Sequence, residues 1–389
     1  MSPKEQLEQL THGTATVLSE KELLTKLEDG RPLRAKLGVD PTAPDIHLGH
    51  TVVLEKLRQF QVLGHQTVLI IGDFTATVGD PTGRSSTRPP LTREEVLANA
   101  ETYTDQAFKI LDRELTEVVY NGDWFRKMSY EEVLKLNARV TMQQMLQRED
   151  FKNRLEGAKE IRLHEIQYPI MQGWDSVEVR ADVELGGTDQ LFNILVGRDM
   201  QKSEGMEALV AMCLPILEGT DGVKKMSKSY GNYVGVDEDP GQMFGKTMSV
   251  SDDLMDRWYT LLLGQERNET LHPMEAKKEL AFFIVARYHG EEKAKEARTD
   301  FESKFVKNDD EAVWPEVDLG DERRLIASVS TAFLEGYNVK RSGGEIRQLI
   351  TQGAVQFDGE KFADVKGNLP QDVNGKILRL DKKRSVRIL

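Results

Sequence analysis

Two short segments of the sequence carry side chains suited to binding phosphate groups. The first, GVDPTAPDIHLGH, spans residues 38–50 and places His47, Gly49 and His50 where an apolar run passes into a helical pattern. Histidines three residues apart share one face of a first helical turn, so both can donate hydrogen bonds to phosphate oxygens beside the positive end of the helix. Gly49 lacks a Cβ, which allows a flat ring to approach the backbone. The alternative is a pair of histidines that make only local hydrogen bonds at a helix cap.

The second segment, KKMSKSYGN, spans residues 224–232 and follows an apolar run. Lys225 and Lys228 could neutralise negative charge that builds on a leaving polyphosphate, and a loop of this composition could close over a bound nucleotide. A solvated basic turn is the alternative. The pentapeptide KMSKS, however, arises by chance in a chain of this length with a probability on the order of one in ten thousand. The segment therefore indicates a functional loop.

The sequence pattern of the first 215 residues predicts the fold that positions these two segments. Short apolar runs alternate there with amphipathic stretches, which is typical of a mostly parallel sheet with crossover helices. The candidate strands are residues 33–39, 66–72, 116–120, 179–185 and 208–217. Capping-box spacing predicts helix starts at Thr92 and Ser129. Gly64 is placed to end a helix that begins near His47. In an open α/β sheet, ligands bind beyond the carboxyl ends of the strands, where the histidines would lie.

The second half of the chain has a different pattern. Beyond about residue 245 the strand signals stop and three helical segments follow, before an acidic, proline-containing segment at 309–321 that we predict to be a linker. The last part couples a short helix, a glycine turn and a strand with an Asp-Gly turn. It carries 11 Lys and Arg against 7 Asp and Glu, although the whole chain has a net charge of −13. The predicted domains are residues 1–245, 246–320 and 327–389. For the basic tail, a solvated surface is the alternative to a nucleic-acid-binding role.

Composition narrows the class of protein further. The chain of 389 residues is too long for one ordinary domain, and no apolar run approaches the roughly 18 residues of a membrane span. The N-terminal residues are polar and charged, so we expect a soluble cytoplasmic protein with no membrane partner. Cys213 is the single cysteine, which excludes an internal disulfide framework and disfavours a cysteine-based zinc site.

The order HLGH, then KMSKS, at either end of an α/β domain resembles the two signatures of class I aminoacyl-tRNA synthetases. Between them, YPIMQGWD at residues 168–175 and LGGTDQLFNI at residues 185–194 are similar to the tyrosyl members of the tyrosyl and tryptophanyl branch. The basic tail resembles the small RNA-binding fold that bacterial tyrosyl enzymes share with a ribosomal small-subunit protein. The resemblance implies a Rossmann-like catalytic domain, an α-helical domain of the anticodon-binding type and a small tRNA-binding domain.

The resemblance also implies a reaction. The carboxylate of tyrosine attacks the α-phosphate of ATP, and the tyrosyl group of the adenylate then passes to the 3′ end of tRNA(Tyr). Magnesium accompanies the nucleotide, and no protein-bound metal or organic cofactor is expected. Because the attacking carboxylate is already ionised, the enzyme has to position groups and stabilise charge rather than supply a nucleophile. A homodimer is expected through the helical part of residues 100–165.

The family roles map onto named residues of this sequence. Those expected to hold the ribose and adenine are Asp40, Gly49, His50, Gly187 and Asp189. Those expected at the phosphates are Thr42, His47, Arg84, Arg88, Lys225 and Lys228. Those expected to grip the tyrosine ammonium are Asp80, Tyr168, Gln172 and Gln190. Asp175 matches the residue that accepts the hydrogen bond of the substrate phenol. Those expected to contact tRNA are Arg341, Arg347, Lys382, Lys383 and Arg384.

The sequence departs from the family pattern at one position, and it leaves three alternative functions open. Many family members carry a tyrosine two residues before the strand glycine as a second phenol contact, whereas this chain has Lys36 before Gly38. Either another group replaces that contact or the phenol is read through Asp175 and water; the lysine stem could also simply lie along a strand edge. The alternative functions are a tryptophanyl-tRNA synthetase, a smaller HxGH nucleotidyltransferase and a catalytically idle RNA-binding relative.

Overall fold

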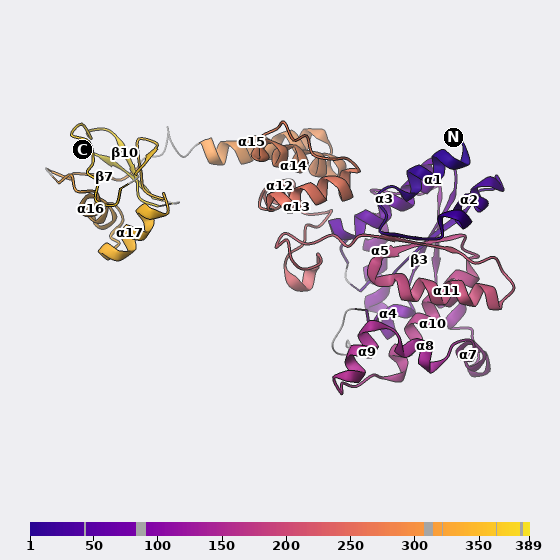
Figure 1. Cartoon of the computed structure of the whole chain (residues 1–389). Coiled ribbons are helices and arrows are strands. Elements are labelled where there is room, and N and C mark those ends of the chain that lie inside the picture. The colour runs from indigo at the N-terminus through magenta and orange to yellow at the C-terminus, as the bar shows by residue number, and fades with distance from the viewer. Residues whose placement is uncertain (43, 83–90, 307–313, 321, 363, 382–383) are drawn as a thin grey trace. The chain divides into compact units, whose positions relative to one another are not determined.

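The computed structural model describes all residues except 43, 83–90, 307–313, 321, 363 and 382–383 (Figure 1). The described chain divides into two compact units, Met1–Phe301 and Glu302–Leu389. No helix in the part of the chain that the structure describes is both long and apolar enough to cross a lipid bilayer.

The first unit is built around a six-stranded sheet in the order β1-β6-β5-β2-β3-β4. The strands are β1 (Thr16–Leu18), β2 (Arg34–Val39), β3 (Gln66–Ile71), β4 (Thr116–Tyr120), β5 (Val183–Gly187) and β6 (Val210–Leu214). All neighbours are parallel except β1, which runs antiparallel to β6. The predicted mostly parallel sheet is therefore confirmed. From β2 the chain winds outward to β4 and then returns to the other side of β2, so the topological switch point lies between β2 and β5.

Two of the predicted strands differ in their bounds. The strand expected at residues 179–185 begins only at Val183, because Val179 caps the preceding helix and Arg180 turns the chain with a φ of 49°. The strand expected at residues 208–217 is shorter and covers Val210–Leu214. The sequence pattern missed β1, whose three residues give too short a run to show a period.

Helices cover both faces of this sheet (Figure 1). On one face, α3 (Leu48–Val62) and α5 (Arg93–Ala107) pack with side chains such as Leu37 and Leu69 into one apolar cluster. On the other face, α11 (Leu191–Ser203) packs on Val68 and Ile70 and also against α10 (Leu163–Glu178). Alternate residues of a strand point to opposite faces, so Lys36 of β2 points to the side of Val68, its parallel partner in the register.

The remaining helices of the sheet region are short. They are α1 (Pro3–Thr11), α2 (Glu20–Glu28), α4 (Thr75–Val78), α6 (Gly122–Phe125), α7 (Tyr130–Asn137), α8 (Met142–Leu146) and α9 (Glu149–Glu156). The predicted capping boxes at Thr92 and Ser129 are present at the starts of α5 and α7. Gly64 follows α3 with a φ of +84°, the left-handed conformation that glycine adopts readily after a helix.

The three helical segments predicted after residue 245 are confirmed as α13 (Asp252–Trp258) with a π-helical turn (Tyr259–Leu263), α14 (Pro273–His289) and α15 (Glu291–Val306). A further helix, α12 (Pro240–Met248), precedes them and was not predicted. All four helices share the core of the first unit. Their buried residues, from Met243 to Ala297, belong to the same apolar cluster as α3 and the sheet. By packing, this segment up to Phe301 is part of the first unit. A division into three domains by function remains a prediction.

The second unit has its own sheet, in the order β7-β11-β10-β8-β9, and its own apolar core. Its elements are β7 (Glu316–Val317), α16 (Leu325–Tyr337), α17 (Gly343–Thr351), β8 (Gln356–Phe357), β9 (Glu360–Lys361), β10 (Ile377–Arg379) and β11 (Ser385–Ile388). Asp358 and Gly359 form the predicted turn, with φ values of 47° and 87°. The predicted linker is wrong in one respect: residues 316–317 form β7, whose place is set by its parallel partner β11 rather than by local pattern.

Candidate active site

A cavity of about 600 Å³ lies at the carboxyl ends of β2 and β5, where the chain reverses its winding. The predicted residues that line it are Asp40, Thr42, His47, Gly49, His50, Asp80, Tyr168, Gln172, Asp175, Gly187, Asp189, Gln190 and Lys225. Lys228 lies in the same loop as Lys225. Arg84 and Arg88 lie outside the described residues. Predicted residues from five separate parts of the sequence therefore line one cavity.

The two histidines stack on each other at the start of α3. His47 is the N-cap residue, its ring centroid lies 3.8 Å from that of His50, and its backbone N–H donates to His50 Nδ1 at 3.3 Å. Burial lowers the pKa of His47 to about 2 and that of His50 to about 4, and the positive charge of Lys228 adds to both shifts. Both imidazoles are therefore neutral near pH 7, and each keeps one N–H that can donate.

Gly49 makes room for this stack as well as for a ligand. A Cβ at this position would lie 3.0 Å from the ring atoms of His47 and 3.5 Å from Cβ of Met226. Gly187 is restricted in the same way, because a Cβ there would lie 2.7 Å from Oδ1 of Asp189. Neither glycine can be replaced without moving a side chain of the cavity wall.

The KMSKS loop is held at both of its lysines by carboxylates. Lys225 Nζ lies 3.2 Å from Asp189 Oδ2, and Lys228 forms an ion pair with Asp45. Met226 between them is 5% exposed and belongs to the apolar core, which anchors the loop. Asp45 was not predicted, although it stands in the HLGH segment itself. The loop thus brings two cations to the edge of the cavity next to the α3 N-terminus.

At the end of the cavity near α9, Asp80 accepts hydrogen bonds on both carboxylate oxygens. Gln190 Nε2 donates to Oδ2 at 2.9 Å, and the backbone N–H of Thr82 donates to Oδ1 at 2.9 Å. Arg148 Nη2 lies 3.2 Å from the same Oδ1, and this arginine is itself buried and paired with Asp150. Sequence reasoning missed Arg148, because it lies in a turn between α8 and α9 and belongs to no motif.

Asp175 lines the same cavity as Asp80 and also accepts hydrogen bonds on both carboxylate oxygens. Asn121 Nδ2 donates to its Oδ2 at 3.2 Å, and Trp124 Nε1 donates to its Oδ1 at 3.0 Å. Burial raises the pKa of Asp175 to about 7, although the positive charge of Lys36 opposes this shift. Asn121 directly follows β4, so its position at the carboxyl end of a strand was a signal that the sequence already contained. For Trp124, the sequence contained no comparable indication of a role in the site.

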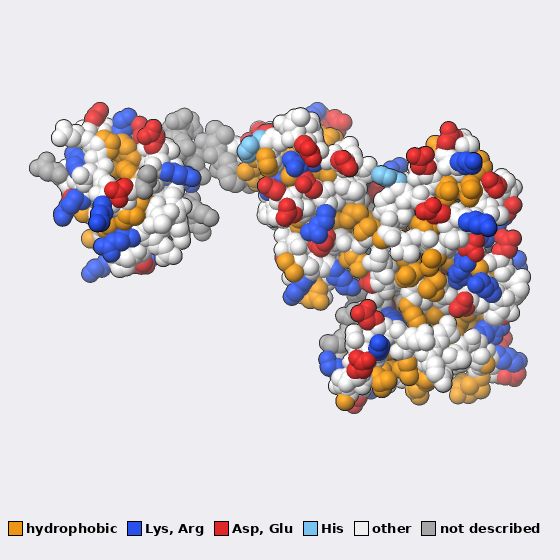
Figure 2. Space-filling model, in the orientation of Figure 1, with side chains coloured by type: hydrophobic (Ala, Val, Ile, Leu, Met, Phe, Trp, Pro, Cys, Tyr) orange, Lys and Arg blue, Asp and Glu red, His pale blue; other side chains and the backbone are white. Residues whose placement is uncertain are grey.

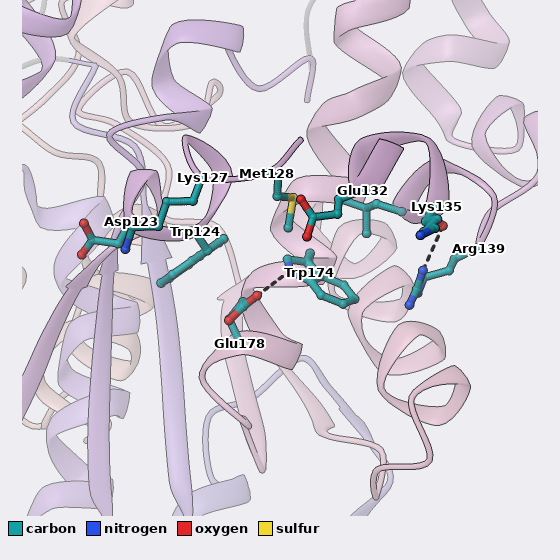
Figure 3. A pocket seen from close by; sticks show the side chains of 10 residues that line it. Asp123, Trp124, Lys127, Met128, Glu132, Lys135, Arg139, Trp174 and Glu178 are labelled. Atoms are coloured by element: carbon teal, nitrogen blue, oxygen red, sulfur yellow. Dashed lines mark hydrogen bonds between the residues drawn. The ribbon is translucent and has the colours of Figure 1, made fainter. Parts of the chain in front are cut away.

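A second pocket, of about 570 Å³, is lined in part by Trp124 (Figure 3). Its wall includes Trp174, whose Nε1 donates to Glu178 at 2.8 Å and whose ring lies 5.1 Å from the guanidinium carbon of Arg139. None of the predicted site residues lines it. Trp124 is thus a wall of this pocket while its indole N–H reaches Asp175.

The predicted tRNA contacts lie in the second unit, on which Figure 2 shows several Lys and Arg side chains. Arg347 is exposed on α17. Arg341 pairs with Glu345 at 2.8 Å, Arg384 pairs with Asp381 at 3.0 Å, and both guanidinium groups lie about 6 Å from the ring of Phe333. Lys382 and Lys383 lie outside the described residues. The three described arginines are therefore carried by one small unit.

A doubly wound sheet with HLGH at its switch point and KMSKS after its last parallel strand is the arrangement of a class I aminoacyl-tRNA synthetase. A family model described as tRNA synthetases class I (W and Y) matches residues 28–306, and the chain belongs to this family.

Curated relatives are similar to the chain over its whole length. The tyrosine–tRNA ligase of Oleidesulfovibrio alaskensis is 50% identical and that of Aquifex aeolicus is 48% identical, each with 100% of both chains covered. Among solved structures, the tyrosyl-tRNA synthetase of Archaeoglobus fulgidus complexed with L-tyrosine superposes with a TM-score of 0.62 at 23% identity. It covers 77% of this chain and 100% of its own. The structural likeness supports the fold, and the sequence likeness supports the family.

Proposed function

We propose that the protein is an ATP-dependent tyrosine–tRNA ligase, which activates L-tyrosine as tyrosyl-adenylate and transfers it to tRNA(Tyr). One observation carries this proposal. The cavity at the switch point is lined by Asp80 and Asp175 and also by the HLGH histidines and the KMSKS loop. We assign the part with Asp80 and Asp175, the amino-acid end, to tyrosine. The full-length similarity to tyrosine–tRNA ligases of other bacteria agrees with it.

In the first step, a carboxylate oxygen of tyrosine bonds to the α-phosphorus of ATP as the bond to pyrophosphate breaks. Asp80, with Tyr168, Gln172 and Gln190, holds the ammonium group, and Asp175 accepts from the phenol. His47 and Thr42 donate to the phosphates, and Lys225 and Lys228 face the charge that develops on the leaving group. The residues that hold the ribose and adenine are Asp40, Gly49, His50, Gly187 and Asp189. Arg84 and Arg88 remain predicted pyrophosphate contacts.

Magnesium would accompany the nucleotide and would shield the charge of its phosphates. Because this ion usually keeps several waters besides phosphate oxygens as ligands, a dedicated protein cage would not be required. The carboxylates of Asp40 and Asp189 line the same cavity and are of the oxygen type that magnesium accepts, so the residues present fit the ion. No further metal or organic cofactor is needed for this chemistry.

In the second step, a ribose hydroxyl at the 3′ end of tRNA attacks the carbonyl carbon of the adenylate, and AMP leaves. The second unit provides phosphate contacts through Arg341, Arg347 and Arg384, with Lys382 and Lys383 predicted beside them. A cytoplasmic location follows from this substrate, because charged tRNA serves translation there.

The active form in this proposal is a homodimer built on the helical layer of the first unit. Exposed apolar side chains gather within the predicted range on α7, α8, α9 and the start of α10, namely Tyr130, Leu134, Met142, Leu155 and Leu163. Figure 2 shows orange side chains along the edge where these helices lie in Figure 1. A monomer of about 44 kDa in sedimentation equilibrium at micromolar concentration would contradict this part of the proposal.

The function is tested by pyrophosphate exchange into ATP with each of the twenty amino acids in turn. Exchange is expected with tyrosine and with no other amino acid. Exchange with tryptophan would show a tryptophanyl-tRNA synthetase instead. Exchange with none, from a folded protein, would leave an idle RNA-binding relative.

Replacing Asp175 tests whether its carboxylate accepts the hydrogen bond of the tyrosine phenol. Both carboxylate oxygens accept hydrogen bonds, so Asp175→Asn turns an amide N–H toward a donor, either Asn121 or Trp124. We expect kcat/KM for tyrosine to fall about 10- to 100-fold, while KM for ATP stays unchanged.

The pH dependence of the same assay gives a second readout. Asp175 loses its proton as pH rises through about 7, and the ionised form is the better acceptor for the phenol. In the wild-type protein, kcat/KM for tyrosine should therefore increase between pH 6 and pH 8, and Asp175→Asn should lack this increase. If Asp175→Asn lowered kcat/KM for ATP as much as kcat/KM for tyrosine, the assignment of Asp175 to the substrate phenol would be contradicted.

A further inference from the structure

A buried ion pair contacts Gln172, a residue of the cavity wall, and has no role in the proposed reaction steps. Lys36 of β2 and Glu184 of β5 are direct partners in the parallel register, and Lys36 Nζ lies 3.0 Å from Glu184 Oε1. Their exposed fractions are 0% and 1%. Because β2 is a central strand, the alternative that the Lys36 stem lies along a strand edge is excluded. Burying two charges is costly unless both are fully hydrogen-bonded, so their other contacts are informative.

The remaining contacts of Lys36 are all with α10. Its ammonium group donates to the Ser176 Oγ at 2.7 Å and to the backbone carbonyl of Gln172 at 3.3 Å. With Glu184 these make three acceptors for the three N–H groups of a lysine. The side chain is therefore tied to the turn of α10 that carries Gln172 and Asp175, two residues that line the cavity.

Glu184 holds the same turn from the other strand. Its Oε2 accepts from Ser176 Oγ at 2.6 Å, and its Oε1 accepts from Gln172 Nε2 at 3.2 Å. Gln172 is one of the residues assigned to the substrate ammonium group, and its amide orientation is set by this carboxylate.

The hydrogen bonds continue from Gln172 to the other residues assigned to the substrate ammonium group. Asn193 Nδ2 donates to Gln172 Oε1 at 2.8 Å and lies 3.0 Å from Gln190 Oε1 as a second acceptor. Gln190 in turn donates to Asp80 at 2.9 Å. A single chain of contacts thus joins the buried ion pair to Asp80.

We infer that Lys36 and Glu184 are positioning residues for tyrosine recognition, which orient Gln172 and hold the Asp175 turn of α10 against the sheet. The inference rests on the proposed function. It also explains how the pocket works without a tyrosine at position 36: the phenol is read by Asp175, and the lysine fixes the helix that presents Asp175.

The charge of Lys36 has a second consequence for Asp175. The charged and titratable groups around this carboxyl are Lys36 on β2, Glu184 on β5 and Tyr168 on α10, while Asn121 and Trp124 donate to it. Burial raises the pKa of Asp175, Lys36 lowers it, and Glu184 raises it by a smaller effect. Loss of Lys36 therefore moves the ionisation of Asp175 to higher pH.

The test uses the full-length protein with Lys36→Met, which keeps an unbranched side chain one heavy atom shorter and removes the charge. Tyrosine binding is measured by equilibrium dialysis without ATP. The kinetics of pyrophosphate exchange are measured with the concentrations of tyrosine and ATP varied separately. We expect tyrosine affinity to fall about tenfold or more, with KM for ATP changed less than about twofold. The rise of kcat/KM for tyrosine with pH should move to higher pH.

Two further variants separate positioning from stability. Lys36→Met leaves Glu184 as an unpaired buried charge, which could unfold the protein. In the double variant Lys36→Met/Glu184→Gln, no unpaired charge remains and the amide can still bond to Ser176 and Gln172. It should fold, regain part of the tyrosine affinity and keep an upward-shifted pH profile. Lys26 is a matched control, because it is also a buried lysine, 5% exposed and paired with Asp182 at 3.5 Å. Lys26→Met should leave tyrosine affinity unchanged.

The outcomes are distinct for the function and for the inference. If the wild-type protein shows no tyrosine-dependent exchange, the proposed function fails. If the wild-type protein exchanges tyrosine and the folded single or double variant binds tyrosine as tightly, with an unshifted pH profile, the positioning role is refuted. The positioning role is also refuted if Lys36→Met raises KM for ATP by as much as it weakens tyrosine binding. The same holds if Lys26→Met weakens tyrosine binding to the same degree.

Discussion

A protein that ends at Val306 is expected to form tyrosyl-adenylate at the full-length rate and to charge almost no tRNA. All described residues of the candidate active site lie in the first unit, whose apolar core ends at Ala297 and Phe301. The second unit has a separate core and carries the arginines assigned to tRNA. Removing it takes away several phosphate contacts together, and such contacts dominate both the affinity for nucleic acid and its salt dependence.

The measurement compares pyrophosphate exchange with tRNA charging in the full-length and shortened proteins. Circular dichroism and a thermal melt establish that the shortened protein is folded. The charging rate should fall by about 10³-fold, since the loss of several phosphate contacts changes affinity by such factors. In the full-length protein, tRNA affinity should fall steeply with salt. Equal loss of both reactions in a folded protein, or full charging activity, would show that the tRNA role of the second unit is wrong.

Lys228→Ala should slow adenylate formation by about 10²- to 10³-fold and leave tyrosine binding nearly unchanged. The lysine lies in the loop beside the α3 N-terminus, where it pairs with Asp45, and it has no contact with the amino-acid end of the cavity. Its positive charge is expected to meet charge that develops mainly on the leaving pyrophosphate. An interaction that strengthens only in the transition state lowers the rate when it is lost, and it has little effect on ground-state binding.

Single-turnover kinetics with saturating tyrosine and ATP measure this rate, and equilibrium dialysis measures tyrosine binding. Lys224→Ala is the matched control from the same loop, because Lys224 is exposed and its Nζ lies 4.9 Å from the Tyr230 ring centroid. The control should keep the wild-type rate. A loss of tyrosine affinity as large as the loss of rate in Lys228→Ala would rule out the transition-state role.

Local patterns in the sequence were sufficient for much of the fold. The capping boxes at Thr92 and Ser129 involve residues three apart, so their geometry does not depend on the rest of the chain. The alternation of apolar runs and amphipathic stretches predicts a mostly parallel sheet, and that rule also places His47 and His50 at a helix start beyond a strand. The family, too, could be inferred from sequence, because HLGH and KMSKS are short and continuous.

The tertiary structure decided which distant side chains complete the site. Arg148 contacts Asp80 across 68 positions of the sequence, and Trp124 contacts Asp175 across 51. Neither belongs to a local pattern, so only the packing of helices on the sheet could bring these pairs together. The short strands β1 and β7 have the same origin, because a strand of two or three residues is defined by its hydrogen-bonded partner.

Lys36 shows most clearly which conclusions came from the sequence and which required the tertiary structure. The sequence by itself determined that a lysine occupies a strand position where many relatives carry a tyrosine, and it left the role of that lysine open. The structure shows the partners of this lysine, with Glu184 beside it on the neighbouring parallel strand and Ser176 Oγ 2.7 Å from its Nζ, and from these partners we infer its positioning role. A charge inside a central strand is stable only when such partners surround it, and the order of strands in the sheet, which pairs β2 with β5, is a property of the whole fold.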